Sequence, residues 1–320
     1  MQVYDPELGR VISAAFTTFH GNLDQAGAFL ARQVHDWLEA MRGEIPPEEV
    51  YKHPLSYPML LFPWWVEKAL RQAPDFAWQT DLVYSTVNGY YAIRMIDNLM
   101  DGHATIELQI LPALNFFYTE FQRPYQRYFA HEHPFWDHFT ATWYASAEVT
   151  IRDARAETID RDHFVQVTAR KTCAVKIPVA AVCYRYERPD LIPPWAQLVD
   201  LFGCWHQMYN DLFDWRQDLE RETHTYFLSE AERRKKPAES VTDWVIREGF
   251  AWGIETLAAW MAQLQAMSDE LGSPDALAYL KTREAMLSER QKIVVAGLQS
   301  AAQLLTLLRQ AAVSSSNGHT

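Results

Sequence analysis

Residues 90–102 read YYAIRMIDNLMDG, and this stretch decides what fold and chemistry to expect. Its side chains are mostly apolar, yet it contains two aspartates four residues apart. Side chains at that spacing lie on one face of a helix, so Asp97 and Asp101 form a row of oxygen ligands. We call these two residues the first stripe.

A second stretch, residues 207–221, reads QMYNDLFDWRQDLER and repeats this arrangement. Asn210, Asp214 and Asp218 follow one another at single helical turns, and we call them the second stripe. Like charges at this spacing destabilise a helix, and burying them unpaired costs several kcal/mol more. We therefore expect a cation between the stripes. Ligands that are all oxygen favour Mg²⁺, which also takes water and substrate phosphates.

A stripe of this kind can also be an ordinary solvated helix face, because the chain has 41 Asp and Glu residues. Its surroundings argue against that reading. Between residues 82 and 100 the only charge outside the first stripe is Arg94, which lies on the same face. The second stripe follows the mostly apolar residues 198–205, and Arg221, three helical turns after Asn210, lies on the same face.

The rest of the 320-residue chain is also predicted to be helical. Glycine is scarce, with 12 residues, and apolar positions recur at intervals of three and four. The expected helices span residues 7–42, 55–73, 76–101, 104–130, 135–157, 161–186, 193–222, 240–270 and 273–312. Many long helices with short connections predict one all-α domain, a helical bundle over residues 1–312, with a disordered tail at 313–320.

Composition and charge narrow the class of protein. A net charge of −12 argues against a general nucleic-acid binder. The N-terminus lacks the features of a signal peptide, and the most apolar segment, residues 57–66, is too short to span a bilayer. The three cysteines have no metal-site spacing and suit a reducing compartment. We expect a cytoplasmic protein without a transmembrane segment, and we leave open whether it is a monomer or a homodimer.

The first stripe resembles one of two metal-binding motifs of the class I isoprenoid synthases, all-α enzymes that ionise prenyl diphosphates. DNLMD at residues 97–101 is similar to their aspartate-rich DDxxD motif, with asparagine at the second position. The two stripes begin 113 residues apart, at 97 and 210, in the order that this superfamily has. The resemblance covers residues 83–226.

The second stripe resembles three variants of the other motif. NDLFDWRQD at 210–218 is similar to the NDxxSxxxE of terpene synthases, with aspartates in place of serine and glutamate. It also resembles the FQxxDDxxD of chain-elongating prenyltransferases. Together with Gln207, Arg221 and Tyr226, it resembles the second DxxxD region of squalene and phytoene synthases.

The resemblance implies a fold of the class I terpenoid synthase type, with an active-site cavity lined by antiparallel helices. It implies a Mg²⁺-dependent terpene synthase that ionises a C10–C20 allylic prenyl diphosphate, releases pyrophosphate and cyclises or quenches the carbocation. Three Mg²⁺ ions would be present with the substrate. The implied catalytic and metal-binding residues are Asp97, Asp101, Asn210, Asp214 and Asp218.

Basic side chains would bind the diphosphate. Arg94 and Arg221 are the leading candidates because each shares a face with a stripe, although Arg94 also has the spacing for an intrahelical ion pair with Asp97. Lys171 begins a pair similar to the Lys-Thr of polyprenyl synthases, and Arg170 is placed somewhat like the diphosphate-sensing arginine of terpene synthases. A surface lysine is the alternative reading of Lys171.

The cavity wall would include side chains one and two turns before the stripes. These residues are Tyr90, Ile93, Gly203 and His206. Aromatic faces stabilise cations by roughly 0.5–2 kcal/mol each, and the chain has 12 Trp, 15 Tyr and 16 Phe residues. Most of these aromatic residues are expected in the core. The basic residues 232–237 form either a lid over the diphosphate or a solvated loop.

Several functions remain open. Chain elongation is disfavoured because residues 102–105, GHAT, lack the Arg-Arg that follows the first motif in elongating enzymes. A terpene synthase is the leading hypothesis, and head-to-head joining, as in squalene and phytoene synthases, is the alternative. Transfer of a prenyl group to another acceptor is a third. A di-metal oxygenase needs Glu-x-x-His pairs, which the stripes lack. A non-catalytic helical scaffold would leave the stripes unexplained.

Overall fold

Helices make up the regular structure that this computed structural model describes. The described residues are 5–43, 45–100, 108–167, 171 and 173–316, with only the backbone described for 173 and 298–316. The helices of nine or more residues are α1 (Pro6–Gln25), α2 (Ala28–Arg42), α4 (Leu61–Leu70), α5 (Phe76–Met100), α6 (Leu114–Gln122), α7 (Phe135–Asp153), α9 (Cys173–Arg185), α10 (Ile192–Glu220), α11 (Tyr226–Arg234), α13 (Phe250–Glu270) and α14 (Pro274–Ser316). No strand occurs in these ranges, so the predicted single-domain all-α fold is confirmed.

Shorter segments connect the long helices. They are α3 (Pro47–Lys52), η1 (Leu108–Ala113), η2 (Tyr125–Arg127), α8 (Arg161–Gln166), η4 (Pro189–Leu191), α12 (Val241–Trp244) and the π-helical turn η5 (Val245–Gly249). None of the helices in the described ranges combines the length and the apolar character that crossing a bilayer requires.

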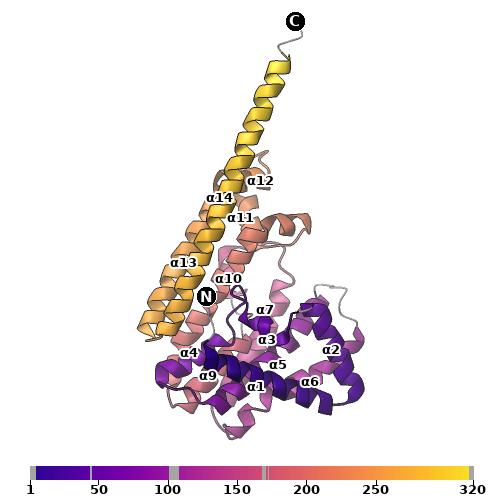
Figure 1. Cartoon of the computed structure of the whole chain (residues 1–320), viewed down its shortest axis with the longest axis vertical. Coiled ribbons are helices and arrows are strands. Elements are labelled where there is room, and N and C mark those ends of the chain that lie inside the picture. Colours follow the sequence, from indigo (N-terminus) through magenta and orange to yellow (C-terminus); the bar gives the residue numbers. More distant parts are fainter. Residues whose placement is uncertain (1–4, 44, 101–107, 168–170, 172, 317–320) are drawn as a thin grey trace.

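Two groups of helices carry the two stripes (Figure 1). In the first group α5 packs against α1 and α6, while α4 and α7 pack against α9. In the second group α13 packs against both α10 and α14. Helix α9 contacts both α5 and α10. It therefore links the helix of the first stripe to the helix of the second.

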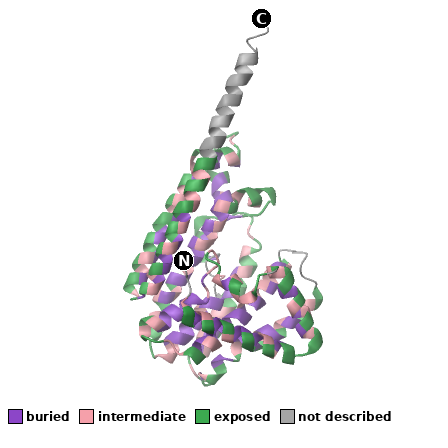
Figure 2. Ribbon diagram, in the orientation of Figure 1, coloured by how far each residue is buried: buried purple, intermediate pink, exposed green. Residues whose placement is uncertain are grey.

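The core consists largely of aromatic and aliphatic side chains on the facing sides of these helices (Figure 2). The buried aromatic residues include Trp64, Trp65, Phe116, Phe117 and Trp205, in line with the expectation that most aromatic residues lie in the core. Trp252 is half-buried and packs against the core. Burial of so much apolar surface, at roughly 25 cal/mol per Å², supplies the main stabilisation of the fold.

Two glycines let neighbouring helices approach the helices that carry the stripes. A Cβ atom on Gly89 in α5 would lie 2.9 Å from the Phe121 ring of α6. A Cβ atom on Gly253 in α13 would lie 2.5 Å from Leu212 Cδ1 in α10. Larger side chains at these positions would push the helices apart, because carbon atoms do not approach so closely.

The helices with the clearest predictions match the structure closely. Helix α5 covers 76–100 where 76–101 was predicted, and α10 covers 192–220 where 193–222 was predicted. The prediction of one helix over 7–42 was wrong because Gly27, with φ of 136°, separates α1 from α2. Only glycine adopts such a conformation readily, so this residue ends the helical path.

Other boundaries also differ from the prediction. The predicted helix 161–186 is divided between α8 and α9, and the described part of 104–130 is divided among η1, α6 and η2, with Pro112 inside η1. Helices α3 and α11 were not predicted. Helix α14 continues to Ser316, four residues into the predicted disordered tail, because no glycine or proline interrupts residues 298–316. Residues 317–320 lie outside the described residues.

Candidate functional site

A single cavity of about 490 Å³ receives side chains from both stripes. The end of α5 contributes Asp97, and α10 contributes Asn210, Asp214 and Asp218. The other walls come from the end of α7, from Lys171 and from residues 223–225. Four of the five stripe residues are therefore brought together. The fifth, Asp101, lies outside the described residues.

The electrostatics of the second stripe fit a site that receives a cation. Burial, and then the nearby carboxylate of Asp214, raise the pKa of Asp218, while Arg221 acts in the opposite direction. The ionised form of Asp218 is therefore disfavoured without a positive partner. Asp214 itself is 51% exposed, and its nearest ion-pair partner is Arg290, with Nη2 3.8 Å from Oδ1.

In the first stripe, Asp97 is paired within its own helix. Arg94 Nη1 donates a hydrogen bond to Asp97 Oδ2 at 3.1 Å, which is the intrahelical ion pair that the spacing allows. The Arg94 side chain is half-exposed and is not part of the cavity wall. Tyr90, one turn earlier, packs against the rings of Tyr51 and Tyr91 and likewise does not line this cavity.

Lys171 reaches the cavity and forms an ion pair with Asp153 of α7, which lines the same wall. Asp153 Oδ1 is buried without a hydrogen-bond partner and lies 3.5 Å from His163 Nε2. Sequence reasoning missed Asp153, although Glu157 follows it four residues later within the predicted helix 135–157. In the structure α7 ends at Asp153, so the two carboxylates do not form a helical pair, and Asp153 shares the cavity with Thr150 instead. Arg170 lies outside the described residues.

Asp211 also lines the cavity, but its contacts give it a structural role. Its carboxylate accepts a hydrogen bond from Gln207 Nε2 at 2.8 Å and from the backbone N–H groups of Tyr226 and Phe227. These are the first two N–H groups of α11, which have no partner within their helix. Burial raises the pKa of Asp211 to about 7, while the bond from Gln207 acts in the opposite direction.

Two predicted substrate-binding residues lie beside the cavity rather than in its wall. Arg221 follows the last residue of α10, and its Nη2 is 2.7 Å from the Gln217 amide oxygen when that amide is oriented to accept. Tyr226 is buried and stacks on Phe164 with 4.7 Å between ring centroids. The adjacent residue Thr225 reaches the cavity instead.

Gly203 and His206 lie earlier on α10 and do not line the cavity. Gly203 is buried in the helix. His206 faces α14, where Arg283 Nη2 lies 3.3 Å from its Nδ1, and its ring packs against Tyr57 with 5.5 Å between centroids. The spacing of one and two turns before the second stripe was therefore a poor guide to the cavity wall.

Because of His206, the protein should unfold more easily at acidic pH. Burial, and secondarily Arg283, lower its pKa to about 3, whereas an unfolded histidine titrates near 6.5. Below pH 6.5 the unfolded chain therefore binds a proton that the folded chain does not bind until about pH 3. The free energy of unfolding is therefore highest above pH 6.5 and falls as the pH is lowered from 6.5 toward 3. Because part of the ring is exposed, we expect a loss of about 1–2 kcal/mol at pH 5.

Urea unfolding at pH 7.5 and pH 5.0 tests this expectation. His206→Asn keeps an acceptor for Arg283 but cannot be protonated, so its stability should change less between the two pH values. His131→Asn, at an exposed position, is the matched control and should behave like the wild type. Equal pH dependence in His206→Asn and the wild type would contradict the assignment.

Ile93 lines a second, smaller cavity of about 170 Å³ between α5, α6 and α7. Its wall is apolar and includes the rings of Tyr118 and Trp143, which meet edge to face with 5.4 Å between centroids. Met100 and Thr150 line both cavities. The polar cavity thus adjoins an apolar one.

Other sequence features lie away from both cavities. In the basic stretch 232–237, Arg234 pairs with Glu230 at 2.7 Å and Lys235 pairs with Glu232. No residue of this stretch is part of the cavity wall, so its role as a lid stays a prediction. In the histidine-rich segment 131–138, His133 Nδ1 accepts a hydrogen bond from the backbone of Phe135.

The donor set of the polar cavity fits a hard cation, although not a preformed cage. Within the ranges that the structure describes, no three His, Cys, Asp or Glu side chains are grouped closely enough to hold a metal ion. The cavity nevertheless offers carboxylate and amide oxygens, one of which, Asp153 Oδ1, is buried without a hydrogen-bond partner. Mg²⁺ is commonly bound by one or two carboxylates with water and substrate phosphates, which matches such a wall.

Comparison with known proteins does not assign the chain to a family. No protein-family model matches it, and no curated protein matches it either.

Proposed function

We propose that this protein is a Mg²⁺-dependent enzyme of the class I terpene synthase type that works in the cytoplasm. It would ionise an allylic prenyl diphosphate, release pyrophosphate and let the carbocation cyclise or be quenched. One observation carries the proposal: side chains of both acidic stripes line one polar cavity, which also contains Lys171 and adjoins an apolar cavity.

Within this proposal, Asp97, Asn210, Asp214 and Asp218 would hold the metal. Bound Mg²⁺ would neutralise the negative charge that gathers on pyrophosphate as the carbon–oxygen bond breaks. The raised pKa of Asp218 supports this assignment, because a cation nearby would remove the cost of its ionisation.

The basic residues would bind the phosphate oxygens. Lys171 is already in the cavity wall, where its ion pair with Asp153 holds the ammonium group. Arg221 is close enough to Asp218 to influence its pKa, so a rotation of its exposed side chain would bring it toward the same oxygens. Arg94 would have to leave Asp97 to do so.

The apolar cavity would shelter the hydrocarbon end of the substrate from water. The faces of Tyr118 and Trp143 would stabilise positive charge there through their quadrupoles. A cavity of about 170 Å³ is close to the roughly 150 Å³ that accommodates benzene, so it holds about one five-carbon unit. A short substrate is therefore favoured over a long one.

Incubation of the purified protein with C10, C15 and C20 allylic diphosphates tests the proposal. We expect pyrophosphate release that requires Mg²⁺ and stops with EDTA, together with extractable products that contain one prenyl unit. Products of 30 or 40 carbons would instead identify head-to-head joining. No release from any of the three diphosphates would overturn the proposed function.

The small size of the apolar cavity predicts that a larger side chain in its wall will disfavour longer substrates. Ala147 lines this cavity from α7, and Ala147→Leu should narrow it. We expect kcat/KM for the C15 diphosphate to fall roughly tenfold more than that for the C10 diphosphate, because each displaced methylene is worth about 0.8 kcal/mol. Ala145→Leu, an exposed position in the same helix, should leave the ratio unchanged. Equal effects of both variants would contradict the assignment.

A further inference from the structure

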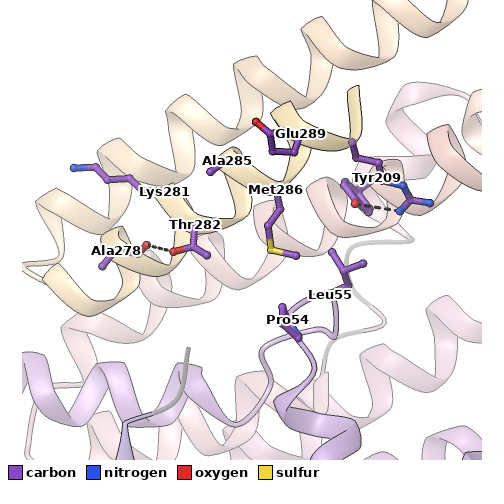
Figure 3. A pocket seen from close by; sticks show the side chains of 10 residues that line it. Pro54, Leu55, Tyr209, Ala278, Lys281, Thr282, Ala285, Met286 and Glu289 are labelled. Atoms are coloured by element: carbon purple, nitrogen blue, oxygen red, sulfur yellow. Dashed lines mark hydrogen bonds between the residues drawn. The ribbon is translucent and has the colours of Figure 1, made fainter. Parts of the chain in front are cut away.

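A third cavity, a groove of about 800 Å³ that shares no wall residue with the polar cavity, runs along α14 (Figure 3). One wall is a face of α14 with the small side chains of Ala278, Thr282 and Ala285. The facing wall comes from Pro54 and Leu55. Volumes of roughly 300–1,000 Å³ are typical of small-molecule sites. We refer to this cavity as the α14 groove.

The shape of the α14 groove suits an extended apolar chain. Its wall on α14 runs from Ala278 to Glu289, a helical length of about 16 Å at 1.5 Å per residue. An extended chain advances about 1.2 Å per bond, so the groove matches roughly a dozen carbon atoms. Figure 3 shows Met286 pointing across the groove toward Leu55, which gives the floor an apolar, adaptable surface.

One end of the groove is positively charged. Arg290 Nη1 donates a hydrogen bond to the Tyr209 hydroxyl at 3.1 Å, and its guanidinium lies 4.2 Å from the centroid of the Phe213 ring. Its contact with Asp214, at 3.8 Å, is long for an ion pair. The nearest acidic residue in the wall, Glu289, is already paired with Lys292 at 2.7 Å.

A second guanidinium, that of Arg283, packs on the Tyr209 ring without lining the groove. Arg283 is only 1% exposed; it donates to the Pro54 carbonyl oxygen at 2.5 Å and lies 5.7 Å from the Tyr209 ring. Its Nε has no hydrogen-bond partner, and no ion pair of Arg283 occurs among the residues whose side chains are described. A buried cation without a carboxylate leaves a positive potential that an anion would offset.

We propose that the α14 groove binds a single-chain amphiphile, with an apolar chain of about twelve carbons along α14 and an anionic head at Arg290. Fatty acids and prenyl phosphates share this chemistry. The inference does not depend on the proposed reaction, because it concerns a different cavity and requires neither Mg²⁺ nor turnover.

Calorimetric titration of the full chain with laurate, in EDTA and below its micellar concentration, tests the proposal. We expect one site with a Kd on the order of 10 µM. Hexanoate and dodecyltrimethylammonium should bind at least about tenfold more weakly, because the first is too short and the second has the wrong charge. Farnesyl monophosphate, titrated in parallel, distinguishes the two sources: tighter binding than laurate assigns an isoprenoid ligand, and weaker binding assigns a fatty acid.

Two variants locate the site. Ala285→Trp, at an exposed position of α14, should fill the groove and weaken laurate binding at least about tenfold, whereas Ala258→Trp, exposed on α13, should not. Arg290→Gln should weaken laurate at least about tenfold but leave dodecanol unchanged. The proposal is overturned if neither laurate nor farnesyl monophosphate binds, or if Ala285→Trp leaves binding intact. It is also overturned if the protein sediments as a dimer that Ala285→Trp dissociates, because a second copy then covers the groove.

Discussion

Asp214→Ala should lower Mg²⁺-dependent pyrophosphate release at least about 100-fold without unfolding the protein. Asp214 lines the cavity that both stripes share, and its carboxylate would be a metal ligand in the proposed reaction. Its side chain is 51% exposed, so its removal should change stability by no more than about 0.5 kcal/mol. A residue that acts as a metal ligand should show this combination, a large loss of activity with little change in stability.

Pyrophosphate release, with urea unfolding in parallel, measures both effects. Asp97→Ala tests the first stripe in the same way and should also lose activity. Asp269→Ala is the matched control, since Asp269 is an exposed aspartate of α13 that does not line the cavity. If the chain were a helical scaffold, Asp214→Ala would change no activity and would relieve the repulsion of Asp218. Retained activity in Asp214→Ala would remove the metal-binding role of the second stripe.

The parts of the fold that sequence predicted best are those where helical periodicity and burial agree. Helices α5 and α10 are mostly apolar around the stripes, and their ends lie within two residues of the predicted ends. The division between α1 and α2 depends on one glycine, Gly27, and helical periodicity continues on both sides of it. Helical periodicity over a long window therefore did not reveal that the helix breaks at Gly27.

Helix geometry alone predicts only the part of the candidate site that lies on one helix. The spacing of Asn210, Asp214 and Asp218 follows from helix geometry, so their common face could be predicted from the sequence. Asp153 reaches the cavity because of how α7 packs, which no spacing within α7 encodes. His206 shows the converse: a position halfway along α10 faces α14 rather than the cavity, because the partner of each helix face depends on tertiary packing.

Helix α11 was missed because its main stabilising contact is distant in sequence. Thr225 accepts a hydrogen bond from the Leu228 N–H, which is an ordinary cap. The first two N–H groups of the helix are bound by the carboxylate of Asp211, 15 and 16 residues earlier. In sequence, Asp211 reads as part of an acidic motif, and its burial distinguishes it from its exposed neighbour Asp214.

Asp211→Ala is therefore expected to cost about 3 kcal/mol of unfolding free energy, a larger effect on stability than any stripe substitution. The loss leaves the N–H groups of Tyr226 and Phe227, and the Gln207 amide, without their acceptor, and an unsatisfied buried donor costs about 1–3 kcal/mol. Urea unfolding at pH 7.5 measures the difference. Hydrogen exchange at the two α11 amides should also accelerate, because local opening would need less free energy.

Asp211→Asn separates this structural role from catalysis. The amide keeps an oxygen acceptor for the α11 backbone, so stability should fall by less than about half as much as in the alanine variant. Because the residues just before α11, including Thr225, line the polar cavity, the alanine variant should also lose activity through a displaced wall, whereas the asparagine variant should keep most of it. An alanine variant as stable as the wild type would show that Asp211 does not fix α11, and a folded but inactive asparagine variant would make it a ligand instead.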